Sequence, residues 1–270
     1  LRGTFKKKYS PYMYMSDASD IVVICEPVLD RTYSVGDYTL TELGIEKGSW
    51  NEGSYQGGMP EIVSCAGTTG NIALNLVRLN GMVSGNSHLG GVPILDYLGG
   101  RPQFTTTLYC PLSDDKNSLL YRSEVNFPGL DLISPKGSSP TLIDVLITPD
   151  GERTFLASNL PQKNLPLHEE EISLGTQKDY LIISGYELSR FDGERLVDYI
   201  SCSPRRIVLD LASPHLIESD VDLYRSAVRF SDYVLSSEEE YLALTGKGFG
   251  QGEIDPCLLY TSDAADDANC

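Results

Sequence analysis

The chain has 270 residues and a formal net charge of −17, because 38 Asp and Glu outnumber 21 Lys and Arg. Such an acidic composition repels phosphate backbones and anionic lipid, so neither nucleic acid nor a membrane is expected as a partner. No apolar run approaches the roughly 18 residues that span a bilayer, and the N-terminus lacks the pattern of a signal peptide, so we expect a cytoplasmic protein.

Cysteine and histidine spacing argues against several classes of enzyme. The six cysteines form no Cys-x-x-Cys pair, and the chain is long enough to fold without a disulfide framework. The three histidines are not at metal-ligand spacing, and no Gly-x-Ser-x-Gly sequence occurs. Zinc enzymes and most hydrolases are therefore disfavoured.

The first third of the chain contains an apolar run and an amphipathic segment. Residues 1–19 show no clear periodicity and are expected to form an N-terminal extension. The run Ile21–Ile24 predicts a buried strand. The apolar spacing within Thr68–Leu79 predicts a helix that is opened by Gly67 and a Thr cap and is ended by Asn80-Gly81.

Two regions of different character follow. Gln103–Ser158 contains β-prone runs separated by turn residues, which predict strands and hairpins, some of them outside the main sheet. After Pro166, short apolar strands alternate with helices. The predicted elements are strand 180–184, helix 193–200, strand 206–211, helix 217–230, strand 233–235 and helix 238–244. This alternation predicts a parallel sheet covered on both faces, with ligands at the carboxyl ends of its strands.

Residues 251–270 interrupt the alternation. They show no strand and helix pattern that would continue it, and they resemble translated adapter read-through, so we expect a non-native tail. On this expectation the sheet ends after Leu235 and leaves an open edge.

Four motifs are candidates for chemistry, and each also has a purely structural interpretation. Asp30 follows a predicted strand, where it is either a carboxylate at the sheet edge or a solvated turn residue. Ala66–Asn71 is a glycine-flanked helix start, which can approach a polar ligand or simply cap the helix. Pro149–Thr154 has the composition of a hairpin turn, and the acidic run Glu238–Glu240 suits any helix N-terminus.

Together, the order and spacing of these motifs resemble the ribokinase-like (PfkB-type) family of carbohydrate and nucleoside kinases over about residues 20–247. Asp30 is similar to the family's substrate-hydroxyl aspartate, although Glu26 stands where Asn is usual. Ala66–Asn71 resembles the Gly-Gly-Ser-x-x-Asn substrate motif, with alanine in place of the first glycine. Further along, Ser237 stands where the family's Asn-x-x-Glu motif has Asn, while its Glu is retained as Glu240.

Within this family the chain most resembles the inosine-guanosine kinases. The resemblance rests on Gly67–Asn71, Gly151–Phe155 and a basic, aromatic N-terminus. Residues 83–100 depart from the Gly-Asp-Asp-x-x-Gly segment of sugar kinases, and adenosine kinase is the nearest competitor.

The resemblance implies an α/β fold in which a mainly parallel central sheet forms a three-layer sandwich with helices. It implies a kinase domain over residues 20–250, with a small β-rich lid drawn from about residues 31–38 and 103–158. A homodimer formed through that lid is a possible assembly.

The implied activity is ATP- and Mg²⁺-dependent transfer of a phosphoryl group to the 5′-hydroxyl of inosine or guanosine, in purine salvage. The residues implied to bind substrate are Asp30, Gly67, Thr68, Gly70, Asn71 and Arg153. Glu240 is implied to organise magnesium and phosphate indirectly.

The family's catalytic aspartate and anion hole lie in a Gly-Ala-Gly-Asp motif, which does not occur in these 270 residues. We therefore expect a C-terminally truncated kinase in which no catalytic base can be assigned and which shows no turnover by itself. Two alternatives stay open: an adenosine or sugar kinase of the same family, and a non-catalytic nucleoside-binding fragment.

Overall fold

The structure is a computed structural model that describes residues 20–84, 88–89, 92–93, 104–158, 165–169, 172, 176, 179–247 and 258–260. The expected N-terminal extension and most of the expected tail lie outside the described residues. In the described part, no helix is both long enough and apolar enough to cross a membrane.

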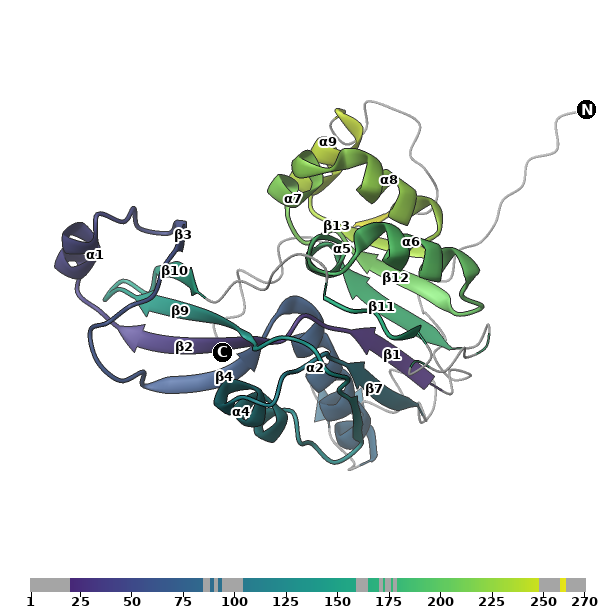
Figure 1. The fold of residues 1–270 in the computed structure, drawn as a ribbon, viewed down its shortest axis with the longest axis horizontal. Helices are drawn as coiled ribbons and strands as arrows, with labels where there is room; N and C mark the ends of the chain where they lie inside the picture. The colour runs from purple at the N-terminus through teal and green to yellow at the C-terminus, as the bar shows by residue number, and fades with distance from the viewer. Residues whose placement is uncertain are drawn as a thin grey trace, which may run out of the picture.

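The larger of two main sheets has seven strands in the order β14-β13-β12-β11-β1-β7-β8 (Figure 1). Its strands are β1 (Asp20–Ile24), β7 (Thr105–Tyr109), β8 (Leu130–Ile133), β11 (Tyr180–Ser184), β12 (Arg206–Asp210), β13 (Tyr233–Ser236) and β14 (Leu258–Tyr260). All neighbouring strands pair in parallel. Parallel strands need crossover connections, and the helices of these crossovers cover both faces of the sheet.

Helices divide between the two faces of this sheet. One face is covered by α2 (Thr68–Ser84) and α4 (Lys116–Glu124). The helices on the other face are α5 (Gly185–Arg190), α6 (Gly193–Cys202), α7 (Pro214–Ser219), α8 (Val221–Arg229) and α9 (Glu238–Thr245). The predicted three-layer α/β arrangement is therefore confirmed.

The central strand β1 supplies apolar side chains to both layers. Ile21 and Val23 belong to the buried cluster beneath α2 and α4, whereas Val22 and Ile24 belong to the cluster beneath α5 to α9. Successive strand residues point to opposite faces, so an uninterrupted apolar run is what a strand buried on both sides requires.

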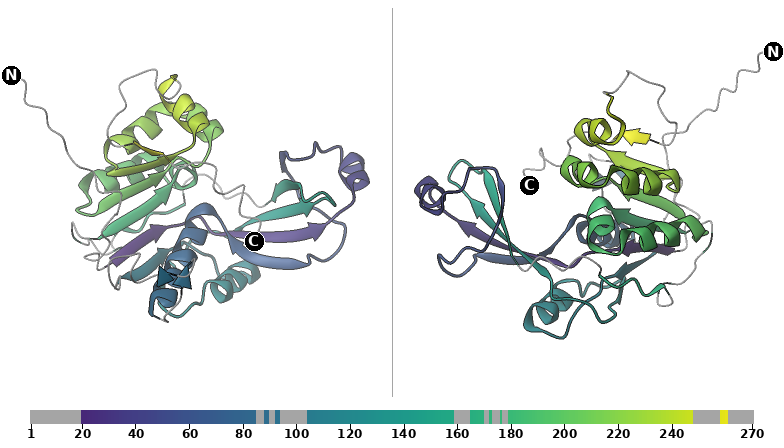
Figure 2. Two further views of the ribbon diagram at one scale, coloured as in Figure 1. Left: turned by 180° about the vertical axis from the view of Figure 1, so that it is seen from behind. Right: turned by 45° about the horizontal axis from the view of Figure 1, so that its top comes forward.

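A second sheet carries five strands in the order β3-β10-β9-β2-β4. Its strands are β2 (Val28–Ser34), β3 (Trp50–Glu52), β4 (Ile62–Ala66), β9 (Thr141–Ile147) and β10 (Arg153–Ser158), and α1 (Asp37–Leu43) follows β2. Figure 2 shows from two further sides that this sheet extends away from the helix-covered sheet. The chain enters it directly from β1 through Cys25-Glu26-Pro27.

The second sheet has a small core of its own on one face. Tyr33, Leu146 and Leu156 are buried there together with Leu40 of α1. On the same side, the Arg31 guanidinium is paired with the buried Asp144 carboxylate, with Nε and Oδ1 2.6 Å apart. The side chains on the opposite face of this second sheet are therefore free to line a cavity.

The extent of the expected lid is corrected by this topology. β7 and β8 fall within residues 103–158, yet they pair in the parallel sheet, and the lid-like sheet takes only β9 and β10 from that range. From residues 31–38, only Arg31–Ser34 is strand, because α1 begins at Asp37. Local β propensity identifies such strands, whereas their sheet is decided by partners far away in the sequence.

Helix ends differ from expectation in two places. α2 continues past Asn80-Gly81 to Ser84, and the Asn80 side chain donates from Nδ2 to the Phe104 carbonyl at 2.9 Å. The predicted helix 217–230 is two helices, because Asp220 has φ −157° and ψ 68° and caps α8 by accepting from the Leu223 amide. An Asp side chain competes well for free amides at a helix start, which explains the break.

The expected open edge after Leu235 is also corrected. Leu258–Tyr260 forms β14, which pairs in parallel with β13 and lengthens the sheet by one strand. The expectation that residues 251–270 contain no strand is wrong for these three residues.

Candidate functional site

A cavity of about 250 Å³ lies where the second sheet meets the carboxyl ends of β1 and β11. Its lining combines charged, polar and aromatic side chains from both sheets. The lining residues are Glu26, Val28, Asp30, Trp50, Gly67, Thr68, Asn71, Thr141, Ile143, Phe155, Tyr186, Glu187 and Arg190. Four of the sequence-predicted substrate residues, Asp30, Gly67, Thr68 and Asn71, are therefore brought together at one site.

Asp30 reaches this cavity from the interior of a strand. It is the third residue of β2, aligned with Ile143 of β9 and Ser64 of β4, and not a loop residue after a strand as expected. Burial raises the pKa of its carboxyl to about 6, and the positive charge of Arg153 opposes that rise. A partly buried carboxylate of this kind is an acceptor for hydroxyl groups of a ligand.

The start of α2 forms the adjoining wall. Gly67 has φ +92°, and a Cβ at this position would come within 3.3 Å of the Glu26 carbonyl oxygen, so the tight turn favours glycine. Thr68 and Asn71 line the cavity from the first turn of the helix, where the backbone N–H of Asn71 donates to the Gly67 carbonyl at 3.0 Å. Polar side chains beside free helix amides suit a polar ligand.

Gly70 lies on the opposite side of this helix turn. A Cβ there would lie 3.3 Å from Cys25 Sγ and 3.4 Å from the Tyr121 hydroxyl, both of them buried in the core. Its small size therefore serves the packing of α2 on the sheet, and it is not among the residues lining the cavity.

Arg153 and Glu240 also lie outside the lining. Arg153 is exposed at the start of β10 and acts on Asp30 through its charge. Glu240 lies in the first turn of α9, where its Oε2 accepts from the Ser237 amide at 2.8 Å and the Ser237 hydroxyl accepts from the Glu240 amide. Burial and the nearby charge of Asp210 raise the pKa of Glu240.

Asp210 and Glu240 are two partly buried carboxylates, and the charge of Asp210 acts on Glu240. Two partly buried carboxylates whose charges repel each other are stabilised by a cation, and protein sites for Mg²⁺ commonly supply one or two carboxylates with water and phosphate oxygens. Carboxylate oxygens such as those of Asp210 and Glu240 are a donor type that Mg²⁺ uses. Within the described residues, no group of three or more His, Cys, Asp or Glu is placed to hold a metal ion.

Glu187 is a buried carboxylate in the cavity lining that sequence reasoning missed. Its Oε1 accepts from the Glu26 amide and the Thr69 hydroxyl, each at 2.9 Å. Its Oε2 accepts from the Ser184 amide at 2.8 Å and from the Ser184 hydroxyl at 2.5 Å. Because two donors meet each oxygen, this geometry holds the ionised form, although burial raises the pKa of Glu187.

Glu26 is a second carboxylate in the lining, on the segment that joins the two sheets, and the sequence indicated its position but no role for it. Its Oε1 accepts from the Thr141 hydroxyl at 2.8 Å, and its Oε2 lies 3.5 Å from Arg190 Nε. Burial raises the pKa of Glu26 to about 7, against the opposing charge of Arg190. Two signals were available: a charged residue two positions after a buried strand, and the Ser-x-x-Glu capping signature at Ser184.

Comparisons with known proteins bear on the fold. No protein-family model matches the chain, and no curated protein matches it. Solved structures do match: adenosine kinase from Trypanosoma brucei brucei has a TM-score of 0.61 at 17% identity, covering 85% of this chain and 69% of that chain. Adenosine kinase from Sinorhizobium meliloti has a TM-score of 0.58 at 16% identity, with coverages of 85% and 68%.

A probable sugar kinase from Rhizobium etli CFN 42 is similar to the same degree, with a TM-score of 0.60 at 16% identity and coverages of 85% and 67%. The chain thus spans about two thirds of the length of each of these proteins. At these identities the likeness is one of fold, and the described residues have the ribokinase-like α/β fold.

Proposed function

We propose that this chain is the substrate-binding part of an ATP-dependent kinase that phosphorylates the 5′-hydroxyl of a purine nucleoside, inosine or guanosine. The observation that carries the proposal is the meeting of Asp30 and Asn71 in one cavity at the carboxyl ends of the parallel strands. A carboxylate and a carboxamide offer both acceptors and a donor to neighbouring hydroxyls of a ribose. The fold shared with adenosine and sugar kinases supports this class of substrate.

Each proposed residue has a defined task. Asp30 and Asn71 hold ribose hydroxyls, and Gly67 and Thr68 line the same pocket. Arg153, whose charge acts on Asp30, approaches the nucleotide or the phosphoryl group. Phosphoryl transfer depends on positioning and on neutralising charge, and these residues supply the positioning.

ATP and Mg²⁺ are the proposed cofactors. Glu240 would organise the magnesium ion indirectly, with the charge of Asp210 nearby, and the ion when bound neutralises charge on the phosphate oxygens of ATP. Because we assign no catalytic base among the described residues, the expectation that this chain alone shows no turnover stays a prediction. A homodimer through the second sheet likewise stays a proposal.

The test measures binding first and turnover second. Calorimetric titration of the 270-residue chain with inosine and guanosine should give saturable binding, and Asp30→Ala should weaken it about ten- to a hundredfold, the value of one charged hydrogen bond. Asp131→Ala, an exposed aspartate on β8, is the matched control and should bind as the wild type does. Unchanged affinity in Asp30→Ala would contradict the assignment of the site.

Release of ADP is then measured with inosine, guanosine, adenosine, ribose and fructose, for this chain, in which we expect none, and for a longer product of the same gene. Preference for adenosine or for a free sugar would contradict the inosine-guanosine assignment and favour the other kinases of this fold. If both this chain and a longer product of the same gene bind nucleosides but release no ADP, the result would favour a non-catalytic nucleoside-binding protein.

A further inference from the structure

Two aromatic rings stand side by side on the cavity wall contributed by the second sheet. Trp50 of β3 and Phe155 of β10 are aligned in the strand register, and their rings are stacked with centroids 5.7 Å apart and planes at 29°. Both line the cavity that contains Asp30. Despite the stacking, 52% of Trp50 remains exposed, so one large aromatic surface is left uncovered.

The register places these rings on the same face of the sheet as Asp30. Asp30 is aligned with Ile143, and Ile143 with Ala157, so these three side chains share a face. Phe155 precedes Ala157 by two residues and therefore points to that face as well. Phe155 is therefore two residues along and two strands across from Asp30, about 12 Å between backbones, and Trp50 is one strand further, about 16 Å from Asp30. Long side chains and a ligand can fill this gap.

The aromatic pair does not contribute to the core of this sheet. The buried cluster of Tyr33, Leu146 and Leu156 lies on the other face, and neither Trp50 nor Phe155 is among the members of the buried clusters of the described residues. A stacked aromatic pair with one exposed ring inside a cavity is the arrangement expected of a binding surface.

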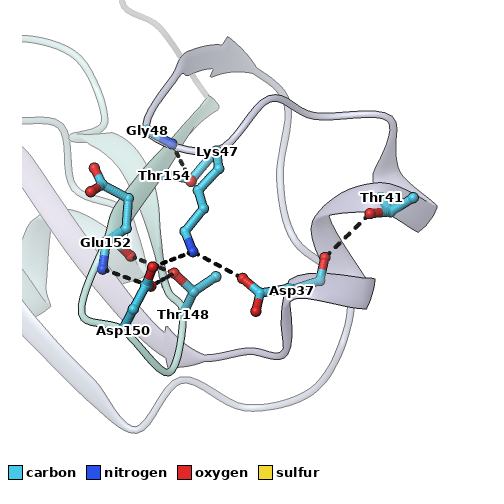
Figure 3. Close-up of polar contacts among 8 residues, drawn as sticks. All are labelled: Asp37, Thr41, Lys47, Gly48, Thr148, Asp150, Glu152 and Thr154. Carbon is cyan, nitrogen blue, oxygen red and sulfur yellow. Dashed lines mark hydrogen bonds and ion pairs between the residues drawn. The ribbon is translucent and has the colours of Figure 1, made fainter.

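The loop that precedes Trp50 is held by polar contacts (Figure 3). Lys47 Nζ lies 3.0 Å from Asp37 Oδ1 of α1 and 2.6 Å from Asp150 Oδ2 of the β9–β10 turn. The Gly48 amide donates to the Thr154 hydroxyl at 3.0 Å, and the Phe155 amide donates to the Ser49 carbonyl at 3.0 Å. Trp50 is the next residue, so its backbone is held before any ligand binds, which lowers the entropic cost of binding.

We propose that Trp50, supported by Phe155, is the specificity-determining residue that stacks on a planar ring of the ligand whose hydroxyl groups reach Asp30. The ligand class is then a nucleoside and not a free pentose or hexose, because only a nucleoside carries both a flat ring and ribose hydroxyls. This inference rests on the proposed function, since it takes Asp30 as the hydroxyl-binding residue. Stacking of a base on an aromatic side chain contributes about 5- to 150-fold in affinity.

The experiment uses Trp50 as its own reporter, because it is the only tryptophan of the 270 residues. Inosine, guanosine and ribose are titrated against the wild type and against Trp50→Ala, Trp50→Phe and Tyr38→Ala, with intrinsic fluorescence for the chains that retain Trp50 and calorimetry for all. Tyr38 is the matched control, an aromatic residue of α1 that is 72% exposed and is not among the residues lining the cavity. Circular dichroism checks that each variant is folded.

We expect nucleosides, but not ribose, to change the Trp50 fluorescence. Nucleoside affinity should fall at least fivefold in Trp50→Ala and less in Trp50→Phe, while ribose binding and the Tyr38→Ala control stay unchanged. Nucleoside affinity that depends on Asp30 but is unaltered in a folded Trp50→Ala would overturn this inference and leave the proposed function standing. A wild-type chain that binds neither nucleosides nor ribose would overturn both.

Discussion

Replacing Glu187 by glutamine should destabilise the chain strongly, although it changes one atom. Each carboxylate oxygen of Glu187 accepts from one backbone amide and one hydroxyl. In Glu187→Gln one oxygen becomes an NH₂ group, and a hydroxyl can turn to accept from it, but a backbone N–H cannot. One buried amide, of Glu26 or of Ser184, is then left without an acceptor.

The magnitude follows from those contacts. An unsatisfied buried amide costs about 1–3 kcal/mol, and the remaining bonds lose the strengthening that a charged acceptor gives them. Removing the buried charge recovers part of its desolvation cost, which the raised pKa of Glu187 reports. We therefore expect the free energy of unfolding to fall by about 2–3 kcal/mol.

Urea unfolding of Glu187→Gln measures this loss, with Glu42→Gln as the matched control. Glu42 is an exposed residue of α1, and its replacement should alter the free energy of unfolding by less than about 0.5 kcal/mol. If Glu187→Gln is as stable as this control, Glu187 is not the ionised, fourfold acceptor that the geometry indicates, and our account of the site's support is wrong.

Three further predictions concern charge at the site. Burial raises the pKa of Glu26 from 4.5 to about 7, so the folded chain binds the proton of this carboxyl more tightly than the unfolded chain does. The free energy of unfolding should therefore fall by about 3 kcal/mol as the pH rises from about 4.5 to 7. In urea unfolding, Glu26→Gln should reduce this dependence on pH, and an unchanged dependence would contradict the raised pKa of Glu26. Calorimetric titrations should show nucleoside affinity decreasing as the pH falls below about 6, because the carboxylate of Asp30, with a pKa of about 6, then becomes protonated. An identical decrease in Asp30→Asn would show that another group is responsible. Lys47→Met should weaken nucleoside binding about two- to threefold at low salt and less at high salt, because the exposed ion pairs of Lys47 are weak and are screened by salt. A loss of affinity that does not depend on salt would argue against the anchoring role of Lys47.

Sequence patterns predicted the parallel sheet well because its strands are buried on both faces. The run Ile21–Ile24 and its counterpart Tyr180–Ser184 have no polar interruption that would suit an exposed strand. The Thr-rich β7 was harder to place, since polar residues such as Thr105 suit either sheet. Its membership depends on pairing with Asp20–Ile24, about 85 residues away, and no local pattern reports such a partner.

The candidate site was predicted in part for a similar reason. Asp30 and the α2 start carry local motifs, and the structure places both on one cavity. Glu187 looks like an ordinary capping residue in the sequence, because its partners Glu26 and Thr69 are 161 and 118 residues away. Trp50 stands in a short strand after a glycine-rich turn, and its cavity appears only when β3 pairs with β10.

The two-sided packing of β1 restricts how this chain can vary in length. Adding or deleting one residue within Asp20–Ile24 would exchange between the layers every side chain on one side of the change. An added residue between Val22 and Val23, for example, would turn Val23 toward the helices now packed on Ile24, and Ile24 toward those now packed on Val23. The β9–β10 turn is under no such constraint, since a side chain at Gly151 would meet nothing within 4 Å, although its φ of +88° still favours glycine. Homologous genes should therefore differ in length at turns of this kind, while β1 keeps a constant number of residues.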